Sequence, residues 1–172
     1  MYKKIIVPLD GSELAECVFP HVEAIAGGCG VQEVILVRAA EPFNLPSGET
    51  VFNDYQVKEI EARREKTANA YLSRVADQLK LGGTTVNTLV LTSKVGGLAS
   101  SRDADIVSAT SGKAADMLAD YVKGSDADLV VIASHGRSGI SRWVYGSVAD
   151  RLLRAACVPV LMVRAPGCIA GI

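Results

Sequence analysis

The chain has 172 residues, of which 49% are hydrophobic, and its formal net charge is −1. This length suits one domain with a sizeable apolar core. A charge so close to neutral gives no electrostatic case for nucleic-acid binding. No apolar run approaches the roughly 20 residues of a membrane-spanning helix. We therefore expect a single domain over residues 1–172, with neither a nucleic-acid partner nor a membrane span.

The first predicted strand is Lys4–Leu9, whose continuous apolar run is typical of a buried parallel strand. Asp10 and Gly11 follow as a turn, and a second apolar run predicts a strand over Val34–Ala39.

Between these strands, apolar residues at helical spacing predict a helix. Ser12 is a suitable cap for its start, because its hydroxyl can accept a hydrogen bond from the first turn. Pro20 lies inside the pattern and is expected to kink the helix. Gly27 and Gly28 are expected to end it.

The middle of the chain predicts a loop, a helix and a third strand. Residues 40–54 are rich in loop-forming residues, and residues 55–80 carry an apolar stripe at helical spacing. The segment EIEARREK in this helix is interpreted as a solvated, charge-laced face rather than a binding patch. Thr85–Leu91 is the third strand. Small polar residues at 92–111 are then followed by a helix from Ala114, closed by Gly124.

The last predicted unit is strand, loop, helix, strand. Leu129–Ala133 is a short apolar run, and residues 134–139 are turn-formers. Gly146-Ser147 opens a helical pattern, and Val158–Val163 is the final strand. A glycine-rich loop that leads into a helix offers an anion free N–H groups and the positive end of the helix dipole. This unit therefore predicts an anion site.

The strict alternation of strands and helices predicts an α/β fold: a doubly wound parallel sheet with helices on both faces, joined by right-handed crossovers. Ligands of such sheets bind beyond the carboxyl ends of the strands, where the strand order reverses.

The cysteines and the first residues bear on the compartment. The four cysteines form no CxxC pair and no metal-ligand spacing, and MYKKIIVPLD has no signal-peptide core. Cys17 and Cys157 fall in helical patterns and are interpreted as small core residues. We therefore expect a reduced, cytoplasmic protein without a metal-ligand cluster of its own.

At this point the chain resembles the universal stress protein family. The family's nucleotide signature is glycine, two residues, glycine, nine residues, glycine, then serine or threonine. Ala133 stands at the first glycine of this signature, and Gly136 and Gly146-Ser147 stand at the others. The segments IIVPLDGSE and VPVLMV resemble the family's first and last strands. The chain departs from the pattern at Ala133 and in residues 93–110, which look like a loop insertion.

The resemblance implies a five-stranded sheet of order 3-2-1-4-5 with its switch between the first and fourth strands. It also implies a homodimer and a site at that switch for ATP, or for AMP or ADP. Mg²⁺ could arrive with the phosphates. We expect no catalytic residues and no protein metal ligands. The expected cofactor-binding residues are Pro8, Leu9, Asp10, Ala39, Ile132, Ala133, Gly136, Arg137, Gly146, Ser147 and Val148.

Several of these residues have two interpretations. Asp10 can accept hydrogen bonds from ribose hydroxyls, or it can be a turn aspartate that supports the Ser12 cap. Ser147 can contact phosphate or cap the helix, and the N–H of Val148 can face phosphate. Arg137 can pair with phosphate or lie on the surface. Ala39 is a wall for adenine only through the resemblance.

Three functions follow. The first is an ATP-binding regulatory module of the stress response, with at most slow hydrolysis and an unidentified regulatory protein partner. The second is an enzyme that uses ATP for hydrolysis or adenylyl transfer. The third is a nucleotide-free dimeric interaction protein. The glycine loop favours the first over the third, and the lack of a clear acid–base set favours it over the second.

The homodimer is expected to form through Val158–Val163. In the order 3-2-1-4-5 this strand lies at an edge, where unpaired N–H and C=O groups invite another strand. Both of its faces are apolar, and Pro159 is tolerable at an edge. A two-fold contact would bury either Val160 and Met162 or Leu161 and Val163. Alternatively, helices cover this strand and the tail from Arg164 to Ile172 shields its edge.

Overall fold

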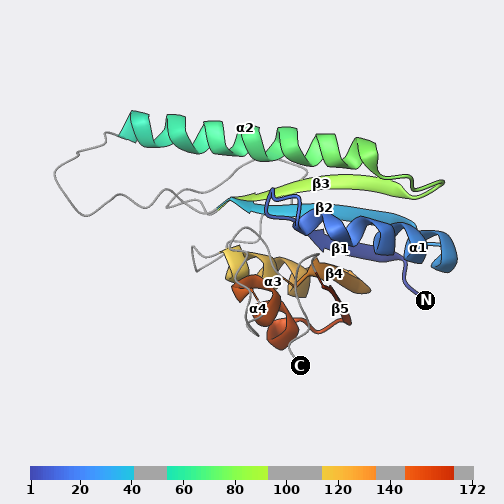
Figure 1. Ribbon diagram of the computed structural model, residues 1–172. Helices are drawn as coiled ribbons and strands as arrows, with labels where there is room; N and C mark the ends of the chain where they lie inside the picture. The colour runs from blue at the N-terminus through green and yellow to red at the C-terminus, as the bar shows by residue number, and fades with distance from the viewer. Residues whose placement is uncertain (41–53, 93–113, 135–145, 165–172) are drawn as a thin grey trace, which may run out of the picture.

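The computed structural model describes residues 1–40, 54–92, 114–134 and 146–164. Its strands and helices alternate along the chain (Figure 1). In chain order they are β1 (Lys4–Pro8), the 3₁₀ helix η1 (Ala15–Val18), α1 (Phe19–Cys29), β2 (Glu33–Ala40), α2 (Asp54–Gln78), β3 (Thr85–Thr92), α3 (Ala114–Gly124), β4 (Leu129–Ala133), α4 (Ser147–Ala155) and β5 (Val160–Val163).

The five strands form one sheet in the order β3-β2-β1-β4-β5, and every neighbouring pair is parallel. The predicted α/β fold and strand order are therefore confirmed. In the central strand, Ile6 pairs with Ile35 of β2 on one side and with Val130 of β4 on the other. The chain winds outward in both directions from β1, so the strand order reverses between β1 and β4.

The core has two halves, one on each face of the sheet. Successive side chains of a strand point to opposite faces, so Ile5 and Val7 pack with α1 and α2, whereas Ile6 packs with α3 and α4. Leu72 and Leu152 are fully buried and anchor α2 and α4 to these halves. Each such side chain contributes about 1.5–3 kcal/mol when it leaves water. Figure 1 shows α2 along β3 and β2, with α3 beside α4.

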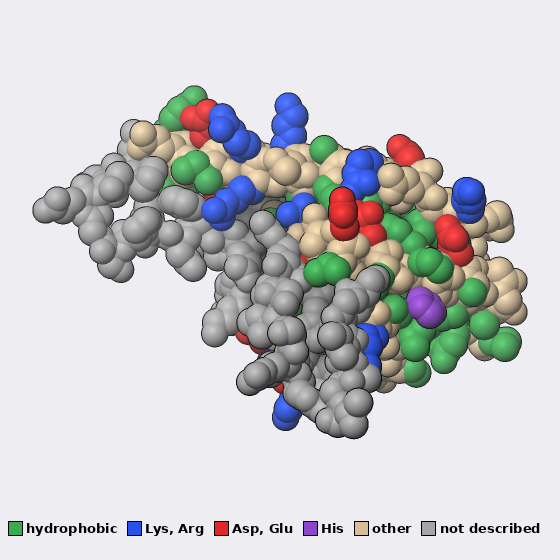
Figure 2. All heavy atoms as spheres, viewed as in Figure 1, with side chains coloured by type: hydrophobic (Ala, Val, Ile, Leu, Met, Phe, Trp, Pro, Cys, Tyr) green, Lys and Arg blue, Asp and Glu red, His purple; other side chains and the backbone are tan. Residues whose placement is uncertain are grey.

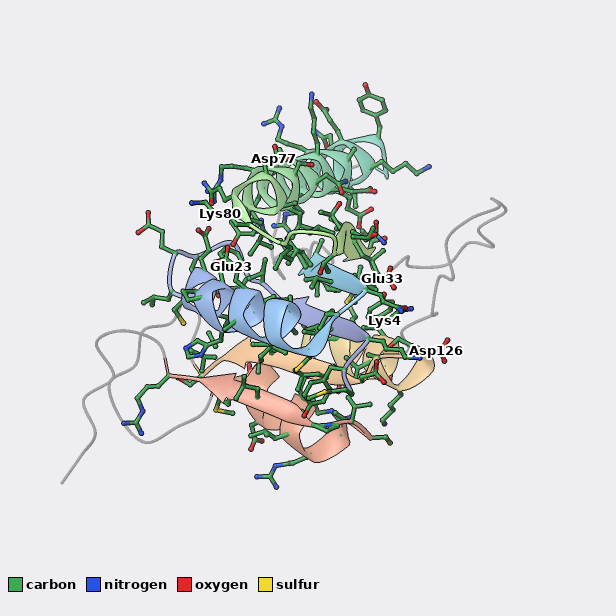
Figure 3. The ribbon with its side chains drawn as sticks, turned by 90° about the vertical axis from the view of Figure 1, so that its right-hand side faces the viewer. Lys4, Glu23, Glu33, Asp77, Lys80 and Asp126 are labelled. Carbon is green, nitrogen blue, oxygen red and sulfur yellow. The ribbon has the colours of Figure 1, made fainter. Side chains whose placement is uncertain are left out.

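Polar side chains link the amino-terminal ends of β1, β2 and β3 (Figure 3). The Lys4 ammonium lies 3.1 Å from a carboxylate oxygen of Glu33, and Asn87 donates a hydrogen bond of 2.7 Å to Glu33. The hydrogen bond to Glu33 raises the pKa of Lys4. Burial alone would raise the pKa of Glu33, but the hydrogen bonds from Asn87 and Lys4 outweigh it and hold this pKa below its ordinary value.

The first helical region differs from its prediction. The Oγ of Ser12 accepts a hydrogen bond of 3.3 Å from the N–H of Ala15, but the turn that follows is 3₁₀ and its N-cap residue is Leu14, not Ser12. Pro20 falls in the first turn of α1. Proline needs no N–H at that position, so the expected kink is wrong. Gly27 and Gly28 lie inside α1, and Gly30 ends the helix with φ 65°.

Smaller differences concern boundaries. β1 ends at Pro8, β5 begins at Val160, and β2 extends to Ala40. Cys157 is exposed beyond the end of α4, so its interpretation as a core residue is wrong, whereas Cys17 packs partly against the core. Most of the predicted loop at 40–54 and the whole insertion at 93–110 lie outside the described residues.

Candidate functional site

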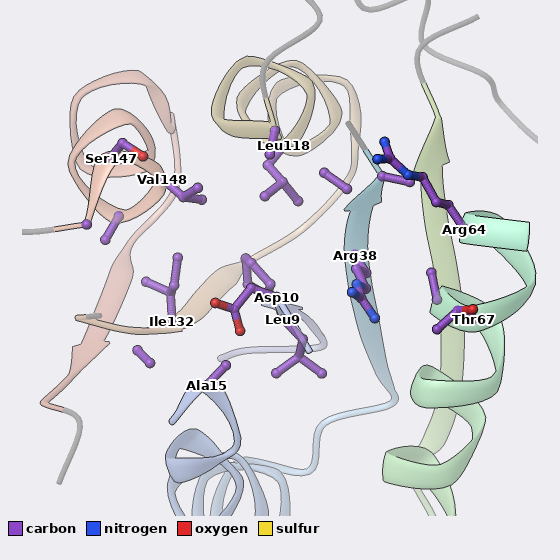
Figure 4. Close-up of a pocket in the computed structure, with 18 of the residues that line it drawn as sticks. Leu9, Asp10, Ala15, Arg38, Arg64, Thr67, Leu118, Ile132, Ser147 and Val148 are labelled. Carbon is purple, nitrogen blue, oxygen red and sulfur yellow. The ribbon is translucent and has the colours of Figure 1, made fainter. Parts of the chain in front are cut away.

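A cavity of about 780 Å³ lies at the carboxyl edge of the sheet (Figure 4). It is bounded by the ends of β1, β2 and β4, by the first residues of α3 and α4, and by α2. Its lining residues are Pro8, Leu9, Asp10, Ala15, Arg38, Ala39, Ala40, Arg63, Arg64, Thr67, Ala68, Ala114, Leu118, Ile132, Ala133, Ser134, Gly146, Ser147, Val148 and Ala149. The cavity includes the β1/β4 reversal, where ligands of doubly wound sheets bind.

The structure brings most of the predicted site residues together around this cavity. Nine of them line it: Pro8, Leu9, Asp10, Ala39, Ile132, Ala133, Gly146, Ser147 and Val148. Gly136 and Arg137 lie outside the described residues. Residues more than 130 positions apart in the chain therefore converge on one volume, because parallel strands end at a common edge.

Asp10 stands two residues beyond the end of β1 and points into the cavity (Figure 4). Its Oδ1 accepts hydrogen bonds from the backbone N–H and the hydroxyl of Ser12, at 2.9 and 2.6 Å. The turn role foreseen for Asp10 is thus present. It orients the carboxylate rather than removing it from the cavity, since Asp10 is part of the cavity lining.

The start of α4 presents backbone N–H groups to the same volume. Gly146 is the N-cap residue, and none of the described side chains makes a cap hydrogen bond to the helix start. The N–H of Gly146 donates to the carbonyl of Ser134 at 3.1 Å, which ties the helix start to the end of β4. Ser147, Val148 and Ala149 form the first turn, so their N–H groups have no acceptor within the helix. Ser147 is therefore the first helical residue and not the cap.

The cavity wall on the α3 and α4 side is apolar. Ala39, Leu118, Ile132, Val148 and Ala149 belong to or pack against the core half on this face. A planar aromatic ring can be buried against such a wall, next to the N–H groups of α4.

The opposite wall is cationic, and the sequence pattern did not reveal it. Arg38 comes from the end of β2, and Arg63 and Arg64 come from α2. The two α2 residues are exposed, as predicted for EIEARREK, but they also line the cavity. On the face shown in Figure 2, cationic and acidic side chains intermingle along α2. Only the path of α2 past the carboxyl edge shows which of its charges face the cavity.

A tyrosine supports this cationic wall. The guanidinium carbons of Arg38 and Arg74 each lie 5.3 Å from the ring centroid of Tyr71. Arg74 also forms an ion pair of 2.8 Å with Glu16. Burial, followed by the charge of Glu16, strongly raises the pKa of Tyr71, so its hydroxyl stays protonated at neutral pH. The stack therefore contains two cations and a neutral ring.

Metal-ligand clusters and membrane-spanning helices are both absent from the described residues. Within 1–40, 54–92, 114–134 and 146–164, no group of three His, Cys, Asp or Glu side chains could hold a metal ion. In the same part of the chain, no helix is long and apolar enough to cross a membrane.

Comparisons with known proteins agree with the fold. The model of the universal stress protein family matches residues 1–164. Universal stress protein MJ0531 of Methanocaldococcus jannaschii is 26% identical over 168 residues, which are 96% of this chain and 84% of the relative. Among solved structures, universal stress protein UspA from Lactobacillus plantarum has a TM-score of 0.70 at 17% identity, covering 95% of this chain and 98% of that one.

Two other similar structures were solved with nucleotides. A universal stress family protein from Arabidopsis thaliana with AMP bound has a TM-score of 0.60 at 12% identity, covering 96% of this chain and 93% of that one. A universal stress protein in complex with cAMP has a TM-score of 0.59 at 20% identity, covering 95% of this chain and 98% of that one.

Proposed function

The chain belongs to the universal stress protein family, and from this premise we propose that it is an ATP-binding regulatory module whose site is the cavity at the β1/β4 reversal. Adenine nucleotides are bound in two structures of the same fold, as AMP and as cAMP. The observation that carries the proposal is the cavity itself. It combines an apolar wall, a carboxylate and an uncapped helix start in a volume of about 780 Å³.

In this proposal each part of the cavity takes one part of the nucleotide. The first-turn N–H groups of Ser147 and Val148 bind the phosphates, helped by the dipole of α4. Asp10 accepts hydrogen bonds from the ribose hydroxyls, and Ala39 and Ile132 cover the adenine. The predicted contributions of Gly136 and Arg137 to phosphate binding lie outside the described residues. In the proposal, Mg²⁺ is carried by the phosphates of the nucleotide.

The test is nucleotide titration by calorimetry, with ATP, ADP and AMP. Gly146 has φ −53° and ψ 146°, a conformation that any residue adopts, so Gly146→Val leaves the backbone unstrained. The added side chain stands where phosphate must approach, and we expect binding to be lost while the protein stays folded. Gly82→Val is the matched control, because Gly82 has open space around it and lies outside the cavity. No binding at millimolar nucleotide, or equal binding by wild type and Gly146→Val, would refute the site.

The proposed module is a homodimer through β5. This strand lies at the sheet edge, and Leu161 is 36% exposed although it stands in the middle of the strand. Val160 and Met162 pack against the core half beneath α3 and α4, and Val163 is buried. The partner strand would therefore cover Leu161 and pair with the edge of β5 that no described strand occupies.

Light scattering on a sizing column tests the dimer. Leu161→Glu should produce a folded monomer, because Leu161 contributes little to the core of its own subunit. Val160→Glu should also unfold the protein, because Val160 faces that core. A wild-type mass of one chain at tens of micromolar would contradict the dimer.

A further inference from the structure

Arg38 lies next to the part of the cavity that the ribose is proposed to occupy. β1 and β2 pair in register, Pro8 with Val37, and the N–H of Leu9 continues the pairing with a bond of 2.8 Å to the carbonyl of Val37. Arg38 follows Val37, so it stands beside the end of β1. Its guanidinium carbon lies 2.9 Å from the point that a Cβ on Gly11 would occupy. The guanidinium therefore covers the turn that begins at Asp10.

Among the described residues, stacking on Tyr71 holds Arg38 in this position. Its guanidinium lies over Tyr71, whereas Arg74 on the same ring is neutralised by Glu16. Across the four described ranges, Arg38 has no carboxylate partner among the ion pairs. A half-buried guanidinium held by an aromatic ring keeps its planar set of donors available for an anion.

The charges of the cavity lining also favour an anionic ligand. Its described lining contains Arg38, Arg63 and Arg64 and one carboxylate, that of Asp10. A cavity lined mainly by one sign of charge attracts ligands of the opposite sign. The 5′-phosphates are already assigned to the N–H groups of α4, on the far side of the β1/β4 reversal. Arg38 is thus a cation of the cavity lining that the proposed contacts with the 5′-phosphates do not use.

We propose that Arg38 forms an anion subsite at the ribose end of the cavity, which favours an adenine nucleotide with a second phosphate on its ribose. This inference rests on the proposed nucleotide site, because Asp10 places the ribose hydroxyls beside Arg38. A carboxylate alone accepts hydrogen bonds from ribose hydroxyls and repels a phosphate, whereas an arginine nearby accommodates a ribose phosphate in dinucleotide-binding folds. The phosphate can stand on the 2′ or the 3′ oxygen, and the two bisphosphates distinguish these positions.

Calorimetric titration with AMP, adenosine 2′,5′-bisphosphate and adenosine 3′,5′-bisphosphate tests the subsite. Wild type should bind at least one bisphosphate about tenfold more tightly than AMP, as one charge-assisted contact allows. Arg38→Gln should remove this preference, and Arg38→Lys, which keeps the charge without the planar donors, should keep part of it. Arg74→Gln is the matched control, because Arg74 contacts the same tyrosine but does not line the cavity. It should keep the full preference.

The outcomes separate the two proposals. A preference that is lost in Arg38→Gln and kept in Arg74→Gln supports the subsite. If wild type binds AMP and both bisphosphates equally, or if Arg38→Gln keeps the preference, the subsite is wrong while the nucleotide site stands. If wild type binds ATP but none of the three ligands, the subsite is wrong while the nucleotide site stands. If it binds neither ATP nor any of the three ligands, both proposals fail. Circular dichroism checks that each variant is folded. If Arg38→Gln does not fold, the preference of Arg38→Lys for a bisphosphate over AMP decides between these outcomes.

Discussion

Replacing Gly11 with alanine tests the geometry around Asp10 and Arg38 in one step. Gly11 has φ 90°, in a region that disfavours any side chain, and its new Cβ would lie 2.9 Å from three atoms of the Arg38 guanidinium. The backbone strain costs about 1–2 kcal/mol. The guanidinium ends a long side chain and can shift, so its displacement adds a smaller amount. We expect the free energy of unfolding to fall by about 1–3 kcal/mol.

A second glycine separates the two contributions. Gly30 also has a positive φ, 65°, but no heavy atom lies within 4 Å of the point where its Cβ would stand. Gly30→Ala therefore measures backbone strain alone, at about 1–2 kcal/mol. The contact with Arg38 is isolated by a double-mutant cycle of Gly11→Ala and Arg38→Ala. Urea unfolding gives each free energy, and an unchanged m-value shows that the same structure unfolds.

The result that would refute this reasoning is specific. If Gly11→Ala is as stable as wild type, the turn after Asp10 does not have its positive φ. If it is destabilised but shows no coupling to Arg38, the guanidinium does not cover the turn, and the proposed subsite loses its position beside the ribose.

Three further predictions concern stability away from the cavity. Gly27→Ala should stabilise the protein by about 0.5–1 kcal/mol, because Gly27 is an exposed helical residue with open space around it. A lower free energy of unfolding in urea would contradict the assignment of Gly27 to the interior of α1. Leu152→Ala should cost about 2–5 kcal/mol, since Leu152 is fully buried, whereas Leu153→Ala, at a residue 43% exposed, should cost about 0.5 kcal/mol or less. Equal losses in that pair would mean that α4 presents a different face to the sheet. Glu33→Gln should cost about 0.2–1 kcal/mol at neutral pH. Because the folded pKa of Glu33 is lowered from 4.5 and that of Lys4 is raised from 10.5, the contribution of Glu33 should be present above pH 4.5 and lost as pH falls through its folded pKa, and that of Lys4 should be lost only as pH rises through its own. A difference from wild type that persists unchanged at low pH would contradict this linkage.

The sequence by itself determined the elements and the class of fold. Apolar runs such as those of β1 and β4 and helical spacing such as that of α2 are local patterns, and their strict alternation is compatible with few topologies. The strand order came from the likeness of particular segments to one family. Asp10 and Gly146-Ser147 were identifiable for the same local reason, since each stands at the end of a strand or the start of a helix.

The tertiary structure decided which charges meet the cavity. Arg38 follows an apolar run, and nothing in that run shows that its guanidinium stacks on Tyr71, 33 positions later, and covers Gly11. In the sequence, Arg63 and Arg64 look like any pair of solvated helical residues. In the structure, the length and path of α2 place them at the carboxyl edge of the sheet, where they line the cavity. A local sequence pattern indicates whether a side chain is buried. Which distant residue it then meets depends on how the helices pack across the sheet, and that information is spread over the whole chain.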